Sequence, residues 1–223
     1  MSRPVAVLRP EPGNAATAAR VEARGWSAIR LPLFSTRACP WAVPDPAGFD
    51  ALLLTSANAP RLAGPGLARL AALPVLAVGA ATADAARAAG LQVRLTGTGD
   101  AASLVEQARA IEVARALHLA GRDRIAASPV VAQTVTVYAS DAVEPGPDIL
   151  RDLAGTVALL HSPRAAARFV RLIDHAQVSR ATLRVVALSP AVAAAAGDGW
   201  DRVAVAAVPG DAALLDAAAR LVG

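Results

Sequence analysis

Leu52-Leu53-Leu54-Thr55-Ser56 and Ala158-Leu159-Leu160-His161-Ser162 are two copies of one pattern, an apolar run that ends in a polar pair. Apolar runs of this length are typical of strands buried on both faces of a parallel sheet. Each copy then enters a segment with an early proline, Pro60 or Pro163, as the first turn of a helix allows. The pattern predicts strands that run directly into helices.

Similar short runs of Val, Ala and Leu recur along the whole chain, and Ala/Arg-rich stretches with helical spacing separate most of them. Gly25, Gly90 and Gly199 each follow such a stretch and precede an apolar residue, as expected where a helix ends and a strand begins. This alternation predicts an α/β fold with parallel sheets. The expected strands are Pro4–Leu8, Ala28–Leu31, Ala51–Leu54, Val75–Val78, Val93–Leu95, Ala116–Leu119, Val135–Tyr138, Val157–Leu160, Val185–Leu188 and Val203–Ala206.

The order of the repeats predicts two related domains, one inserted in the other. One copy of the pattern lies inside the chain, from Ala51 to about Arg94, and the other lies at its end. Proline-rich segments near 32–48 and 133–147 are read as the two crossings between the domains. We therefore expect a discontinuous domain of residues 1–36 and 142–223, an inserted domain of residues 37–141, and a cleft between them.

The composition excludes several kinds of chemistry. All 22 basic residues are arginine, so the chain has no lysine for a Schiff base, a pyridoxal phosphate anchor or a phosphate-binding loop. The net charge of +4 and the pI of about 10.7 would suit nucleic acid. The arginines are scattered, however, without a basic run or interleaved aromatic residues, so we expect no nucleic-acid partner.

Cysteine and histidine usage predicts neither a disulfide nor a metal site. Cys39 is the single cysteine, which fits a reducing cytoplasm, and His118, His161 and His175 lack metal-ligand spacing. No apolar stretch is long enough for a signal peptide or a membrane span, so no membrane association is expected. Nothing suggests a coiled coil, and a monomer is the default expectation.

An ordered set of short motifs resembles the uroporphyrinogen-III synthase family over nearly the whole chain. Each motif is a strand that runs into a turn or a capped helix, and the specificity lies in their order and spacing. The matching pieces are Val7-Leu8-Arg9-Pro10, Leu31-Pro32-Leu33, Leu54-Thr55-Ser56-Ala57-Asn58-Ala59, Ala77-Val78-Gly79-Ala80-Ala81-Thr82-Ala83, Leu119-Ala120-Gly121-Arg122, Val135-Thr136-Val137-Tyr138 and Leu160-His161-Ser162-Pro163.

The resemblance implies a fold and a reaction. The fold is two flavodoxin-like α/β domains joined by a two-stranded connector, with the active site in the cleft. The substrate is hydroxymethylbilane, a linear tetrapyrrole with acetate and propionate groups, which loses its terminal hydroxyl as water and closes with inversion of the last pyrrole. The resemblance implies a cofactor-free, cyclising hydro-lyase, and a transient hand-over of substrate from hydroxymethylbilane synthase is expected.

Hydroxyl groups at the strand-to-helix turns are candidates for binding substrate carboxylates. Ser56, Thr82, Ser162 and Ser189 are expected at such turns, where backbone N–H groups and helix dipoles favour anions. The alternative for each is a helix N-cap with a purely stabilising role.

Arginines that follow strands are candidates for pairing with the same carboxylates. Arg9 and Arg122 are the stronger candidates, and Arg164 is a weaker one, because solvated surface arginines are common. Gly121 would let the backbone approach a ligand beside Arg122. His161 precedes Ser162 and is a further candidate substrate contact, whereas His118 is expected to be a core residue.

Tyr138 is the chain's only tyrosine and matches the family's tyrosine at the end of a connector strand. The hypothesis is that its hydroxyl hydrogen-bonds the leaving hydroxyl and assists its departure. The alternative is a buried tyrosine satisfied by backbone groups.

Two departures from the family pattern and two rival functions stay open. The segment Ile125–Ala132 is shorter than the family's usual helix, and Val192 stands where threonine is common. The first rival is a two-domain α/β binding module that closes on an anionic small molecule without catalysis. The second is a sugar-nucleotide glycosyltransferase, which lacks support because no Gly-rich phosphate loop is present.

Overall fold

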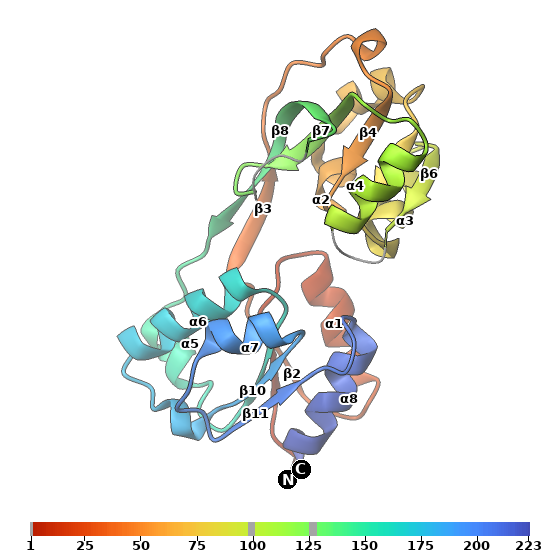
Figure 1. The fold of residues 1–223 in the computed structure, drawn as a ribbon. Helices are drawn as coiled ribbons and strands as arrows, with labels where there is room; N and C mark the ends of the chain where they lie inside the picture. Colours follow the sequence, from red (N-terminus) through yellow and green to blue (C-terminus); the bar gives the residue numbers. More distant parts are fainter. Residues whose placement is uncertain (1, 98–100, 125–128) are drawn as a thin grey trace. The chain divides into compact units, whose positions relative to one another are not determined.

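The structure, a computed structural model, describes residues 2–97, 101–124 and 129–223. The chain forms two compact units (Figure 1). Unit 1 combines Met1–Ser35 with Ala142–Gly223, and unit 2 is Thr36–Asp141. The mixed α/β architecture with parallel sheets confirms the predicted fold class.

Unit 1 is built on a five-stranded sheet with the order β11-β10-β9-β1-β2. All its neighbouring strands are parallel. Numbered along the unit's own chain, this order is 2-1-3-4-5, the arrangement of flavodoxin-like sheets. The strands are β1 (Val5–Val7), β2 (Ala28–Arg30), β9 (Val157–Leu160), β10 (Arg184–Ala187) and β11 (Arg202–Val205).

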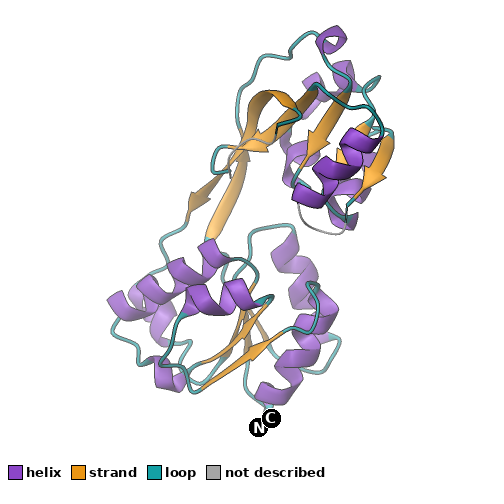
Figure 2. Cartoon of the chain, in the orientation of Figure 1, coloured by secondary structure: helices purple, strands orange, loops and turns teal. Residues whose placement is uncertain are grey.

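Helices cover both faces of this sheet (Figure 2). The alternate residues Val5 and Val7 pack in a cluster with α1 (Gly13–Glu22) and α8 (Asp211–Val222). Ala6 of β1, and Leu8 just after it, pack toward the opposite helices. Burial on both faces explains why these strands read as continuous apolar runs. The opposite helices are α5 (Pro147–Arg151), α6 (Pro163–His175) and α7 (Pro190–Ala196).

Unit 2 contains a six-stranded sheet with the order β3-β8-β7-β4-β5-β6. Its strands are β3 (Phe34–Ala38), β4 (Ala51–Leu54), β5 (Val75–Ala77), β6 (Val93–Thr96), β7 (Ala116–Gly121) and β8 (Val131–Ala142). Helices α2 (Asn58–Leu62) and α3 (Ala80–Ala88) pack on one face, and α4 (Ala101–Ala110) packs on the other.

Five strands of each sheet occupy equivalent positions, but the chain passes through these positions in a different order in the two units. In unit 2, β4, β5 and β6 take the places that β9, β10 and β11 take in unit 1, while β7 and β8 take the places of β1 and β2. This permutation explains the sequence repeat of residues 52–56 and 158–162, which lie at the ends of the equivalent strands β4 and β9. The repeat appears inside the chain for one sheet and at the end of the chain for the other.

The connector strands are where the sequence prediction is incomplete. Strand β3 lies within the segment near 32–48, where the resemblance implies a connector strand but the residue pattern predicts none, and β8 extends well beyond the predicted Val135–Tyr138. Both were hard to detect because polar residues interrupt them, such as the exposed Ser35 and Arg37 of β3, so they form no apolar run. The shortened segment 125–132 lies in part outside the described residues, and β8 begins at Val131.

One buried arginine ties the two crossings together within unit 1. The Arg168 side chain is 10% exposed, and its guanidinium donates to the carbonyls of Leu33 and Val143 and to the Glu144 carboxylate. Val143 N–H also donates to the Leu33 carbonyl, at 3.0 Å. The chain thus leaves and re-enters unit 1 at adjacent, hydrogen-bonded points. Among the described residues, no helix is long and apolar enough to cross a membrane.

Candidate functional site

In each sheet the strand order reverses between two neighbouring strands, so the connections that leave these two strands go to opposite faces of the sheet. Ligands of open α/β sheets bind at this switch point, beyond the carboxyl ends of the strands. In unit 1 this switch point lies between the paired strands β1 and β9. Arg9 follows β1, and His161 and Ser162 follow β9. In unit 2 the switch point lies between β4 and β7.

At the unit 1 switch point, Arg9 and His161 converge on a residue that the sequence analysis missed. Arg9 donates to Asp211 Oδ1 at 3.0 Å, and His161 Nε2 lies 3.1 Å from the same oxygen. Thr17 and Arg20 of α1 donate to Oδ2 at 2.6 and 2.8 Å. Burial alone would raise the pKa of Asp211, but the hydrogen bonds from His161 and Thr17 and the charge of Arg9 lower it below its ordinary value.

The four predicted hydroxyl residues have different local roles. Ser162 and Ser189 are N-caps of α6 and α7, with Oγ accepting from the N–H three residues on, at 3.2 and 3.4 Å. Ser56 accepts from Asn58 N–H at 3.2 Å, just before α2. Thr82 is different, because Gly79 is the N-cap of α3 and Thr82 is buried at the helix's third position. Its place in the first turn, and not at the cap, corrects the N-cap alternative for this residue.

At the unit 2 switch point, Gly121 makes room for Tyr138. The two residues are register partners on β7 and β8, and a Cβ atom at Gly121 would lie 2.7 Å from Tyr138 Cζ and 2.9 Å from its hydroxyl oxygen. The absence of a side chain is therefore required by the tyrosine ring. Within the described part of the chain, the Tyr138 hydroxyl has no hydrogen-bond partner, although the residue is half-buried.

Arg122 is exposed but already paired. It donates to Asp141 at 2.6 Å and to Asp123 at 3.4 Å, and Arg37 donates to Asp141 at 2.6 Å. Hydrogen bonds from Arg37 and Arg122 hold the pKa of Asp141 below its ordinary value, against an opposing effect of desolvation. The weaker candidate, Arg164, has its guanidinium 4.3 Å from the centre of the Phe34 ring.

His118 is a core residue with a specific partner, as expected. Its Nε2 lies 3.0 Å from Thr55 Oγ1, so the pair joins the middle of β7 to the residue that follows β4. Burial, and secondarily the charge of Arg124, lower the pKa of His118 to about 4. The imidazole is therefore neutral at pH 7.

The structure thus gathers the predicted residues at two places. Arg9, His161 and Ser162 lie at the unit 1 switch point, and Ser56, Gly121, Arg122 and Tyr138 lie at that of unit 2. Ser189 and Thr82 follow the next strands, β10 and β5. Sequence reasoning missed Asp211, Thr17, Arg20 and Asp141. Most of their contacts join residues far apart in the chain, and the only local signal was the start of a helix after Gly210.

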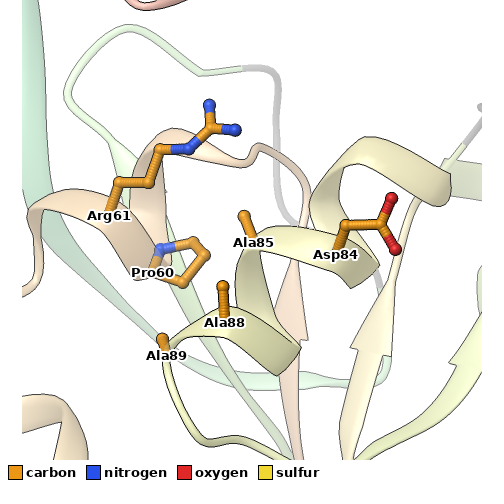
Figure 3. Close-up of a pocket in the computed structure, with 6 residues that line it drawn as sticks. All are labelled: Pro60, Arg61, Asp84, Ala85, Ala88 and Ala89. Carbon is orange, nitrogen blue, oxygen red and sulfur yellow. The ribbon is translucent and has the colours of Figure 1, made fainter.

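A pocket of about 400 Å³ lies elsewhere, lined by residues of α2 and of α3 with its C-cap. Figure 3 shows Arg61 and Asp84 flanking a floor of Pro60 and small alanine side chains. None of the predicted site residues lines it, so it does not mark the candidate site. Among the described residues, no group of three or more His, Cys, Asp or Glu side chains could hold a metal ion.

Comparisons with known proteins agree with the motif pattern. The family profile described as "Uroporphyrinogen-III synthase HemD" matches residues 15–216. No curated protein sequence matches the chain. Two solved structures share its fold: uroporphyrinogen-III synthetase from Helicobacter pylori, with 16% identity, TM-score 0.67 and coverage of 98% of this chain and 99% of that chain, and a mutant uroporphyrinogen III synthase from Thermus thermophilus, with 17% identity, TM-score 0.55 and coverage of 97% and 98%. The chain belongs to the uroporphyrinogen-III synthase family.

Proposed function

We propose that this protein converts hydroxymethylbilane to uroporphyrinogen III, acting as a cyclising hydro-lyase. The carbon–oxygen bond of the terminal hydroxymethyl group breaks, and the hydroxyl leaves as water. The electrophilic methylene bonds to the α-carbon of the last pyrrole that carries the methylene bridge, and that bridge bond breaks and re-forms at the opposite α-carbon, which inverts the ring. The proton displaced from the opposite α-carbon balances the one that leaves with the water. The match of the family profile to residues 15–216 carries the proposal. The donor-rich turns at both switch points are consistent with a substrate that bears many carboxylates.

Substrate binding is assigned to the turns at the carboxyl ends of the strands. Arg9 and Arg122 supply cationic donors, and Ser56, Ser162 and Ser189 supply hydroxyls beside helix N-termini. Thr82 is the least suited of the predicted contacts, because its side chain is buried within unit 2. Since the uncatalysed reaction closes the ring without inversion, these contacts must select one folding of the substrate.

Tyr138 is proposed as the group that assists hydroxyl departure. Its hydroxyl lies at the carboxyl end of β7, beside Gly121, and lacks a hydrogen-bond partner among the described residues. A phenol at neutral pH can donate a hydrogen bond to the leaving oxygen, which lowers the barrier to breaking the carbon–oxygen bond. Arg122 N–H donates to the Tyr138 carbonyl at 2.9 Å, which fixes the backbone at this position.

The test supplies freshly generated hydroxymethylbilane to the metal-free protein and separates type I and type III uroporphyrins after oxidation. The expected product is type III, and Tyr138→Phe should lower its rate of formation by about 10²-fold or more without changing the fold. Type I alone, at the rate of a blank, would instead support the binding-module alternative. A Tyr138→Phe variant with an unchanged rate would remove the proposed role of the hydroxyl.

Three finer expectations accompany this proposal: a cytoplasmic location, a monomeric state, and transient hand-over of substrate from hydroxymethylbilane synthase. Sedimentation analysis tests the second, and the third predicts that added synthase shortens the lag before type III product appears.

A further inference from the structure

One carboxylate at the unit 1 switch point is surrounded by an unusual number of donors. Asp211 is 14% exposed in its side chain and accepts from Arg9, His161, Thr17 and Arg20, two donors to each oxygen. The donors come from three places in the unit: the turn after β1, helix α1 and the turn after β9. The cluster is therefore formed by tertiary structure and not by one local motif.

The cluster contains more positive charge than Asp211 neutralises. Arg9 and Arg20 carry two permanent positive charges against one carboxylate, before any charge on His161 is counted. An aspartate in the first turn of a helix does not need such donors. Asp148 also lies in a first turn, as the second residue of α5, with an 89% exposed side chain and an ion pair only to Arg151 among the described residues. The donors around Asp211 thus exceed what capping α8 requires.

The surrounding residues hold the donors in place. A Cβ atom at Gly13 would lie 2.7 Å from Arg9 Cζ, so the first residue of α1 leaves space for the guanidinium. The His161 side chain is 9% exposed, and its Nδ1 is buried without a partner in the described part of the chain. The ring is thus buried with only its Nε2 engaged, directed at the carboxylate.

We propose that Arg9, His161, Thr17 and Arg20 form a carboxylate-binding subsite, that Asp211 occupies it in the free protein, and that a carboxylate of the ligand exchanges with Asp211. The identity of that carboxylate, an acetate or propionate of the linear tetrapyrrole, rests on the proposed function. The subsite itself rests on the donor cluster at the switch point between β1 and β9. Asp211 then weakens the binding of anions by competition.

The test measures binding of benzene-1,2,4,5-tetracarboxylate by titration calorimetry at constant ionic strength. Asp211→Asn removes the competing charge and is expected to tighten binding by about fivefold or more, in the range of typical coupling between sites. Asp216→Asn is the matched control, because Asp216 lies on the same helix, is 69% exposed and pairs with Arg24 at 2.7 Å. It should leave the affinity unchanged, and adding Arg9→Gln to Asp211→Asn should abolish the gain.

Equal or weaker binding by folded Asp211→Asn would overturn the proposal, since Asp211 would then only position the donors. If the Asp211→Asn variant does not fold, a second measurement on the unaltered protein still tests the proposal. With isotope-labelled histidine, the tetracarboxylate should shift the His161 ring signals, while sodium sulfate at matched ionic strength should not. Binding without any response of His161, or an equal response to sulfate, would also refute it.

The outcomes separate this inference from the proposed function. Suppose that Asp211→Asn binds the tetracarboxylate more tightly, but the unaltered protein forms no type III product from hydroxymethylbilane. The carboxylate subsite then stands and the synthase assignment fails. If type III product forms and Asp211→Asn does not bind more tightly, the synthase assignment stands and the subsite fails.

Discussion

The ring of Tyr138 lies against the backbone of Gly121, so close that a Cβ atom there would be 2.7 Å from Cζ of the ring. This contact joins the end of β7 to the connector strand β8 and positions the hydroxyl that we assign to the reaction. The glycine that the sequence analysis associated with ligand approach is thus required first by a side chain of the same protein.

Gly121→Ala should displace the tyrosine ring and thereby test its position without altering its chemistry. We expect a loss of roughly 1–3 kcal/mol in the free energy of unfolding, as for overpacked sites, and a fall in type III product close to that of Tyr138→Phe. Gly146→Ala is the control, because it has open space around its Cβ position and a φ of −60°. Urea unfolding and the product assay measure both effects. A fully active Gly121→Ala protein would contradict the proposed position of Tyr138.

Arg122→Gln should raise KM for hydroxymethylbilane by about tenfold with little change in kcat, because an arginine that binds a remote carboxylate stabilises substrate and transition state alike. Arg37→Gln is the matched control. Both arginines are exposed, and each pairs with the Asp141 carboxylate at 2.6 Å. If the two variants raise KM equally, the effect comes from loss of the Asp141 pair and not from substrate contact.

The fold could be predicted because its strands are buried on both faces. Leu52, Leu54 and Leu160 have no exposed surface, and burial of every residue in a strand leaves a continuous apolar run in the sequence. Strand β3 has no such run, since it lies at the sheet edge with Ser35 and Arg37 exposed. An edge strand such as β3 is held by backbone hydrogen bonds, as every strand is, but it lacks the burial on both faces that makes a strand recognisable in the sequence.

The candidate site could be predicted only in part, for a related reason. The Ser162 cap is local, because its oxygen accepts from Ala165 only three residues along the chain. The contact between Arg9 and Asp211 joins residues 202 positions apart. No spacing rule links such residues, and only the tertiary structure shows that Arg9 already has a carboxylate partner.

Ser162→Asp should separate helix capping from substrate binding. Aspartate caps helices about as well as serine, so the free energy of unfolding should change little, whereas Ser162→Ala should lose about 1 kcal/mol. If the turn binds a substrate carboxylate, the new negative charge should raise KM by roughly tenfold or more. Ser179→Asp, at an exposed position in the same unit without a capping bond, is the control. An unchanged KM in Ser162→Asp would leave capping as the only role of Ser162.

Arg168→Met should destabilise unit 1 by about 3 kcal/mol, because the Val143 carbonyl and Glu144 lose a buried cationic donor. Arg171→Met, one turn along α6 and exposed, should change stability by no more than about 0.5 kcal/mol. Urea unfolding at pH 7 compares the two variants. Equal stabilities would show that the crossings do not depend on the Arg168 contacts.

His118 should make the stability of unit 2 depend on pH between about 4 and 6.5. Its folded pKa of about 4 lies below the value of about 6.5 expected in the unfolded chain, so the unfolded state binds more protons in this window. Stability should therefore fall as the pH drops from 6.5 to 4, by on the order of 2–3 kcal/mol from this residue alone. Protonation of carboxylates with lowered pKa values, such as Asp174, also destabilises the folded protein as the pH falls. The contribution of His118 is therefore isolated by comparison with His118→Gln. The variant should show a smaller loss between pH 7 and pH 4.5 in urea unfolding, because glutamine has no proton to gain. Identical losses in both proteins would mean that the buried imidazole is not held neutral by its surroundings.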